Sequence, residues 1–132
     1  MPARRRIDPT AGRAAVQGWA ADPDAAGRDL VAAAVRWSLQ EMAERWPGHT
    51  CEVRVPPFGV VQCLAGPRHT RGTPPNVVEA DAVSWLELIT GGLGWAAAVQ
   101  AGRVRASGER ADLSDLLPLV PTTAGPGPAP PG

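Results

Sequence analysis

The chain has 132 residues, a length that suits one domain and argues against most multidomain arrangements. Its 13 basic residues, all of them Arg, balance 13 acidic residues, whereas a dedicated nucleic-acid-binding domain needs an excess of basic side chains to displace counterions from phosphate. Hydrophobic residues make up 44% of the chain and charged residues 20%. This composition indicates a globular protein rather than a disordered one.

The ends and apolar runs of the chain predict its compartment. Three consecutive Arg at positions 4–6 are followed by no apolar stretch, so no secretory signal is predicted. The longest apolar runs, such as residues 31–35, are far shorter than the roughly 18 residues that a membrane-spanning helix needs. We therefore expect a cytoplasmic protein without stable membrane insertion, in which Cys51 and Cys63 stay reduced.

Two helices are predicted in the first third of the chain. Asp8-Pro9 is a favourable helix opening, with Asp as the N-cap and Pro in the first turn, and residues 10–21 follow as a short amphipathic helix. A longer helix is predicted from about residue 28 to residue 45, where apolar residues recur at spacings of three and four before Pro47-Gly48 ends the helix. Those apolar positions are Val31, Val35, Leu39, Met42 and Trp46.

The hydrophobic period then changes to two, which is typical of strands. Residues 51–55 alternate apolar and charged side chains, and residues 60–64 are predicted to form the second arm of a hairpin after a Pro-Pro-Phe-Gly turn. In such a hairpin Cys51 and Cys63 share a face if the turn has three or five residues. They lie on opposite faces if it has four.

A loop over residues 65–76, rich in Gly, Pro, Thr and Arg, is long for a compact domain, and such loops are often functional. The elements predicted after it are a strand over 77–80, a helix over 82–90 between Asp81 and Gly91, a helix over 95–100, a strand over 103–106 and a short helix after Asp112. From residue 121 the chain consists of Pro, Gly, Ala and Thr. We therefore predict one domain over residues 1–120 and a disordered tail over 121–132.

The second half of the chain resembles a known family. The features that carry the resemblance, in order, are Asp81, Trp85, Leu86, Gly91, Leu93, Ala98, Gly102-Arg103-Val104, Gly108 and Leu116-Leu117. Together they resemble the sterol carrier protein 2 superfamily. More narrowly, about residues 5–119 resemble the small actinobacterial sterol-carrier-like proteins, and the loop phrase over residues 66–76 is the specific part of that match.

The resemblance implies an α+β fold with a mixed, mostly antiparallel sheet of four to five strands, helices packed on one face, and an apolar cavity between them. Four strands are visible in the sequence, so either the sheet is reduced or the long loop supplies a fifth. Members of the superfamily bind lipids, fatty acyl chains or sterols without catalysing a reaction. The resemblance therefore implies a non-enzymatic carrier of a hydrophobic small molecule, without a cofactor or a nucleic-acid partner, and it allows a weak homodimer.

The candidate ligand site has an apolar part and a polar part. The apolar part consists of Val60, Val61, Leu64, Trp85, Leu86, Leu88, Ile89, Trp95 and Val99. These residues either line a pocket or form a filled core, and both interpretations stay open. In the polar part, Arg68, His69 and Arg71 either hold a carboxylate or phosphate head group or pair with nearby acidic residues of the chain itself.

Metal binding and catalysis have weak support in the sequence. His49, Cys51, Cys63 and His69 are soft ligands, but no Cys-x-x-Cys pair is present, so buried, inert thiols are the simpler interpretation and no metal is predicted. No base or oxyanion hole marks a Cys-His nucleophile, and no catalytic residue is assigned. The alternative to a carrier is a structural or regulatory interaction module with a filled core. A small enzyme that uses His69 or a thiol is a third hypothesis, for which we expect no activity.

Overall fold

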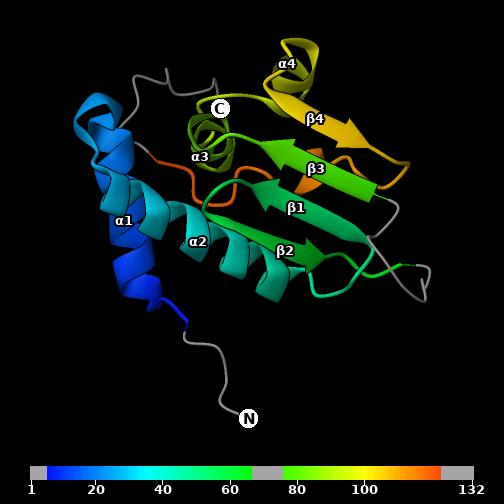
Figure 1. The fold of residues 1–132 in the computed structure, drawn as a ribbon, viewed down its shortest axis with the longest axis horizontal. Helices are drawn as coiled ribbons and strands as arrows, with labels where there is room; N and C mark the ends of the chain where they lie inside the picture. Colours follow the sequence, from blue (N-terminus) through cyan, green and yellow to red (C-terminus); the bar gives the residue numbers. More distant parts are fainter. Residues whose placement is uncertain (1–5, 67–75, 123–132) are drawn as a thin grey trace, which may run out of the picture.

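A four-stranded sheet organises the chain (Figure 1). The computed structural model describes residues 6–66 and 76–122. The strands β1 (Cys51–Val55), β2 (Gly59–Cys63), β3 (Asn76–Ala80) and β4 (Val104–Ser107) lie in the order β2-β1-β3-β4. β1 pairs antiparallel with β2 and parallel with β3, and β3 pairs antiparallel with β4. The mixed, mostly antiparallel sheet that the family resemblance implies is confirmed.

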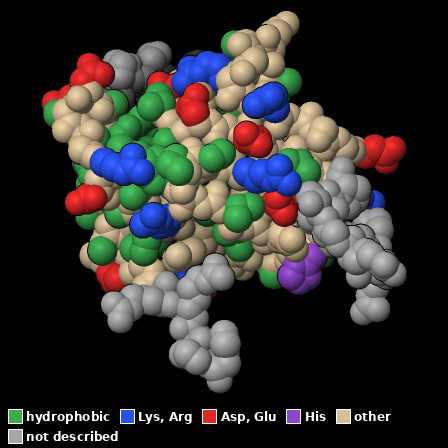
Figure 2. Space-filling view, in the orientation of Figure 1, with side chains coloured by type: hydrophobic (Ala, Val, Ile, Leu, Met, Phe, Trp, Pro, Cys, Tyr) green, Lys and Arg blue, Asp and Glu red, His purple; other side chains and the backbone are tan. Residues whose placement is uncertain are grey.

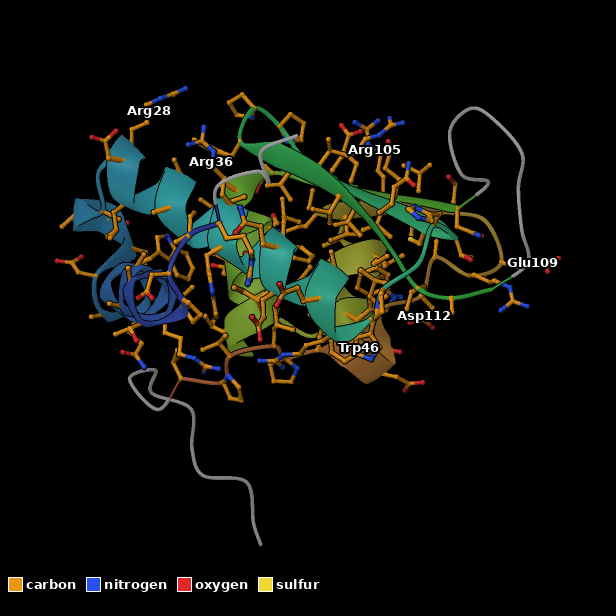
Figure 3. All side chains as sticks on the ribbon, turned by 90° about the horizontal axis from the view of Figure 1, so that it is seen from below. Arg28, Arg36, Trp46, Arg105, Glu109 and Asp112 are labelled. Atoms are coloured by element: carbon orange, nitrogen blue, oxygen red, sulfur yellow. The ribbon has the colours of Figure 1, made fainter. Side chains whose placement is uncertain are left out.

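Helices cover one face of this sheet and leave the other face open, as Figure 3 shows with the sheet above the helices. The helices are α1 (Pro9–Ala21), α2 (Arg28–Arg45), α3 (Ala82–Thr90) and α4 (Trp95–Gln100), with short 3₁₀ turns at Pro23–Ala25 and Ser114–Leu116. Within the described residues α2 packs against α1, α3 and β2, whereas α4 packs against β4 at the other edge of the sheet.

The alternation of side chains along the strands decides which residues enter the core. On β1, Cys51, Val53 and Val55 are buried against the helices, whereas Glu52 and Arg54 lie on the open face. β3 shows the same alternation of buried and half-buried residues. The apolar half of each central strand therefore meets the apolar faces of the helices.

A glycine sets the close packing of α1 on α2. Asp8 caps α1 by accepting a hydrogen bond of 3.1 Å from the N–H of Ala11. One turn later, Gly12 lies against the buried ring of Trp37, and a Cβ at Gly12 would lie 2.1 Å from the Trp37 Cγ atom. Because that distance is far below van der Waals contact, the two helices pack at a separation that only glycine permits at this position.

α3 begins and ends where the sequence predicts. The Asp81 carboxylate accepts a hydrogen bond of 2.7 Å from the N–H of Ser84, and Gly91 ends the helix in the left-handed region at φ 91°. Between these ends the helix presents a continuous apolar surface to α2 and the sheet. The largest fully buried side chains of the core on these elements are Trp37, Leu39, Met42, Trp85, Leu86, Leu88 and Ile89.

Several predicted boundaries differ from those in the structure, and the clearest differences are at β2, β4 and the last short helix. β2 ends at Cys63, because the N–H of Leu64 donates to the Trp46 carbonyl and Leu64 adopts φ 72°. β4 begins at Val104, because the N–H of Arg103 donates to the Ala98 carbonyl and closes the turn after α4. The short helix predicted after Asp112 is only a 3₁₀ turn over Ser114–Leu116.

The end of the described chain is attached to α3. The N–H of Val120 donates to the Ile89 carbonyl at 2.8 Å, and the N–H of Thr122 donates to the Thr90 carbonyl at 3.3 Å. Residues 123–132 lie outside the described residues, so the domain boundary at 120 and the tail after it stay predictions. No helix in the described ranges is long and apolar enough to cross a membrane.

Candidate functional site

A surface groove of about 630 Å³ lies between α2 and the edge strand β2. Its volume is in the range of pockets that hold small molecules. The apolar side chains that line it are Ile7, Leu39, Phe58, Val60 and Val61. Arg6, Arg36, Gln40 and Gly59 complete the lining. We call this surface the α2–β2 groove.

Helical spacing places three groove residues together. Leu39 and Gln40 follow Arg36 by three and four residues along α2, so their side chains project from the same side of the helix as Arg36. Opposite them, Gly59 approaches the helix so closely that a Cβ at this position would lie 3.1 Å from a methyl carbon of Leu39. The floor of the groove is therefore formed where β2 comes closest to α2.

Two arginines meet the turn between β1 and β2. The Nε atom of Arg36 donates a hydrogen bond of 3.1 Å to the Phe58 carbonyl, and the Arg28 guanidinium lies 5.4 Å from the centre of the Phe58 ring. Figure 3 shows Arg28 and Arg36 near each other at the same end of the molecule. The Nη atoms of Arg36 make no hydrogen bond or ion pair with any described residue. Arg36 therefore presents unused donors at the rim of the groove.

The N-terminal segment closes one end of the groove. The N–H of Ile7 donates to the side-chain carbonyl of Gln40 at 3.1 Å, which fixes the segment against α2. Arg6 lies beside it and forms an ion pair of 2.7 Å with Glu44. Since the charge of Arg6 already has an acidic partner, Arg36 is the better candidate for contact with an anionic group.

The structure separates the residues that the sequence placed in one apolar site. Val60 and Val61 line the groove. Leu64 is half-buried just after β2. Trp95 and Val99 belong to α4, which packs on β4 at the opposite edge of the sheet (Figure 1).

The other four apolar candidates are core residues. Trp85, Leu86, Leu88 and Ile89 are each at most 1% exposed on α3 and lie outside the lining of the groove. The Trp85 indole N–H donates to the Ser38 hydroxyl at 2.9 Å, so its polar atom is satisfied within the core. Arg68, His69 and Arg71 lie outside the described residues, and their predicted contact with a head group stays a prediction.

Sequence analysis missed most of the groove lining on α2 and in the turn. Leu39 belongs to the predicted apolar stripe of its helix, and the spacing of Arg36 and Gln40 beside it is the signal that this face reaches the surface. Phe58, the one Phe of the chain, is an apolar residue in a tight turn. Such a residue indicates either a contact with a neighbouring element or an exposed binding surface.

Charged side chains pair with one another on the open face of the sheet, where Figure 2 shows basic and acidic groups side by side. Arg54 contacts Glu52 on the same strand and lies 3.9 Å from Glu79 on β3, and Arg105 on β4 lies 3.8 Å from the same carboxylate. The described residues contain no group of three His, Cys, Asp or Glu side chains that could hold a metal ion. This face therefore carries mutually neutralised charges.

Comparison with known proteins gives one family. Residues 27–119 match the model of a family described as SCP_3, bacterial SCP ortholog. The match runs from the start of α2 to Leu119, so it includes both walls of the α2–β2 groove, but not Arg6 and Ile7. No curated protein matches the chain significantly.

Proposed function

Because this chain belongs to the bacterial SCP ortholog family, we propose that it is a non-enzymatic carrier that binds a hydrophobic small molecule in the α2–β2 groove. The observation that carries the proposal is the lining of the groove, in which five apolar residues from four segments lie beside Arg36, whose Nη atoms have no partner among the described residues. Small-molecule sites have this composition, with mostly apolar walls and a few placed polar groups.

The apolar walls predict how affinity depends on ligand length. Burial of one CH₂ group stabilises a complex by about 0.8 kcal/mol, which lowers the Kd about fourfold. We therefore expect affinity to rise with each added carbon of a saturated acyl chain until the groove is filled. A site that recognised only a head group would show no such dependence.

The rim predicts an acidic head group. The two Nη atoms of Arg36 can donate a pair of hydrogen bonds to a carboxylate or phosphate, which is the geometry that arginine favours. Arg28 adds a second positive charge beside the same turn. Fatty acids and other single-chain anionic amphiphiles are therefore the ligand class that this groove supports best, with Arg68, His69 and Arg71 as further head-group contacts in the proposal.

The proposal is tested by titrating the full chain with saturated fatty acids of increasing length, using calorimetry and native mass spectrometry. Val61→Trp places a large side chain in the groove, because Val61 lies opposite Val53 on the face of the sheet that meets the helices. Val83→Trp is the control, because Val83 lies outside the groove on α3. We expect Val61→Trp to weaken binding at least tenfold and Val83→Trp to leave it unchanged.

Absence of binding by the unmodified chain at any length would overturn the proposal. It would favour the alternative of an interaction module with a filled core, for which the tight packing around Trp85 is the supporting observation. Equal weakening by both Trp variants would place the ligand elsewhere and would refute the assignment of the groove.

A further inference from the structure

Cys51 and Cys63 lie directly opposite each other at the open end of the β1–β2 hairpin. Residues 56–58 form the turn between the strands, which is one of the lengths for which both cysteines share a face. Both side chains are fully buried on the face that meets the helices. The sequence allowed the two cysteines to share a face or to lie on opposite faces, and the structure shows a shared face. Two thiols of adjacent strands therefore point into the same part of the core.

The strand register brings the two thiols close together. Hydrogen-bonded and non-hydrogen-bonded pairs alternate in an antiparallel ladder. Pro56 has no N–H to donate, so Val55 and Gly59 form a hydrogen-bonded pair, and Cys51 and Cys63, four positions along the same ladder, form another. In such pairs the Cα atoms are about 5.5 Å apart. This separation is within the range of about 4.4–6.8 Å that a disulfide spans.

The thiols also interact with each other as acid and base. The Cys51 thiol lies 3.9 Å from the Glu52 carbonyl, and its interaction with the neighbouring thiol lowers the pKa of Cys51 and raises the pKa of Cys63, where burial adds to the increase. Cys51 is therefore the thiol that ionises first. Its thiolate lies next to a second thiol that keeps its proton, which is the arrangement of an attacking and a resolving cysteine.

We propose that Cys51 and Cys63 form a reversible redox site, in which a small hydroperoxide oxidises the pair to an intramolecular disulfide. A hydroperoxide suits this site because both thiols are buried, and a bulky disulfide reagent would not reach them. The Cys51 thiolate attacks the peroxide oxygen, the O–O bond breaks, and Cys51 becomes a sulfenic acid while hydroxide or alkoxide leaves. The Cys63 sulfur then attacks the Cys51 sulfur, the S–O bond breaks, and the proton of Cys63 leaves with the hydroxyl group as water.

The test exposes the folded full-length chain to hydrogen peroxide, removes the peroxide, unfolds the chain and alkylates the remaining thiols. Trypsin cleavage after Arg45, Arg54 and Arg68 separates the cysteines into peptides 46–54 and 55–68. We expect these two peptides to be joined in the oxidised protein and to separate after dithiothreitol. We also expect two alkylated thiols before oxidation and none after it, and a thermal midpoint several degrees higher in the oxidised form, because the crosslink restricts the unfolded chain.

Two variants of the same chain sharpen the test. Cys51→Ser and Cys63→Ser each keep one thiol, and we expect Cys63→Ser to collect sulfenic or sulfinic acid at Cys51, while Cys51→Ser reacts more slowly because Cys63 is the less acidic thiol. The proposal is overturned if both thiols of the unmodified chain remain alkylatable after oxidation. It is equally overturned if the linked peptides come only from dimers, or if Cys51 is oxidised to sulfonic acid without a disulfide.

Discussion

The indole N–H of Trp85 donates a hydrogen bond of 2.9 Å to the hydroxyl of Ser38 and so joins α3 to α2 inside the core. Both residues are at most 1% exposed. The Ser38 hydroxyl in turn donates to the Val35 carbonyl one turn earlier on α2, at 2.8 Å. A serine in the middle of an apolar helix face thus satisfies the polar atom of the bulkiest residue on α3.

Ser38→Ala should therefore destabilise the protein. The substitution leaves the Trp85 N–H buried without an acceptor, which costs about 1–3 kcal/mol of unfolding free energy. Urea denaturation of Ser38→Ala, Trp85→Phe and the double variant measures the effect and its coupling. We expect the double variant to lose less than the sum of the two single variants. Strict additivity would mean that the bond between Trp85 and Ser38 contributes nothing to stability.

Gly12→Ala should destabilise the protein although alanine is the better helix former. The added Cβ would lie 2.1 Å from the Trp37 ring, and overpacking of this kind costs about 1–3 kcal/mol. Gly18→Ala on the same helix is the control, because its Cβ would meet Leu30 at 3.6 Å, an ordinary contact. We expect Gly18→Ala to stabilise the protein by about 0.5–1 kcal/mol. Thermal unfolding of the two variants should shift in opposite directions, and a shift in the same direction would contradict the close approach at Gly12.

Arg36→Ala should weaken binding of a fatty acid more than binding of the alcohol of the same chain length. The arginine contributes charge-assisted hydrogen bonds only to the carboxylate, and their loss is expected to raise the Kd about tenfold. Calorimetric titration with dodecanoate and dodecanol measures both affinities, and Arg13→Ala on α1 is the control for a general change of charge. If Arg36→Ala weakens both ligands equally, Arg36 supports the turn at Phe58 and does not contact the head group.

Asp112 should titrate below the usual range of an aspartate. Hydrogen bonds from the Ser114 side chain and from its backbone N–H, the latter 2.8 Å long, stabilise the carboxylate and lower its pKa. Because the folded pKa lies below the unfolded one, this contribution to stability is present above the unfolded pKa and is lost as the pH falls through the folded pKa. Carboxyl ¹³C NMR should show the pKa of Asp112 moving toward its ordinary value in Ser114→Ala. An unchanged titration in that variant would exclude the Ser114 side chain as the main cause.

Local sequence patterns carry much of the secondary structure of this protein. The apolar spacing and the stop at Pro47-Gly48 correctly predict α2, and Asp81 and Gly91 correctly predict both ends of α3. The alternation over residues 51–55 predicts β1 and its buried face. These predictions succeed because caps, turns and side-chain periodicity act over a few neighbouring residues. The boundary differences at Leu64 and Arg103 depend on backbone hydrogen bonds to residues in other elements.

The place of the candidate site depends on contacts between segments that are distant in the chain. Periodicity marks both Leu39 and Trp85 as apolar positions on a buried helix face, but it does not tell which one borders a groove and which one is enclosed. Both side chains are buried, but Trp85 packs against Ser38 of α2 inside the core, whereas Leu39 also lines the groove, because it faces β2, an edge strand of the described sheet. Strand order and helix placement result from packing of the whole core, so an apolar pattern in the sequence predicts burial but not which buried residues border a groove.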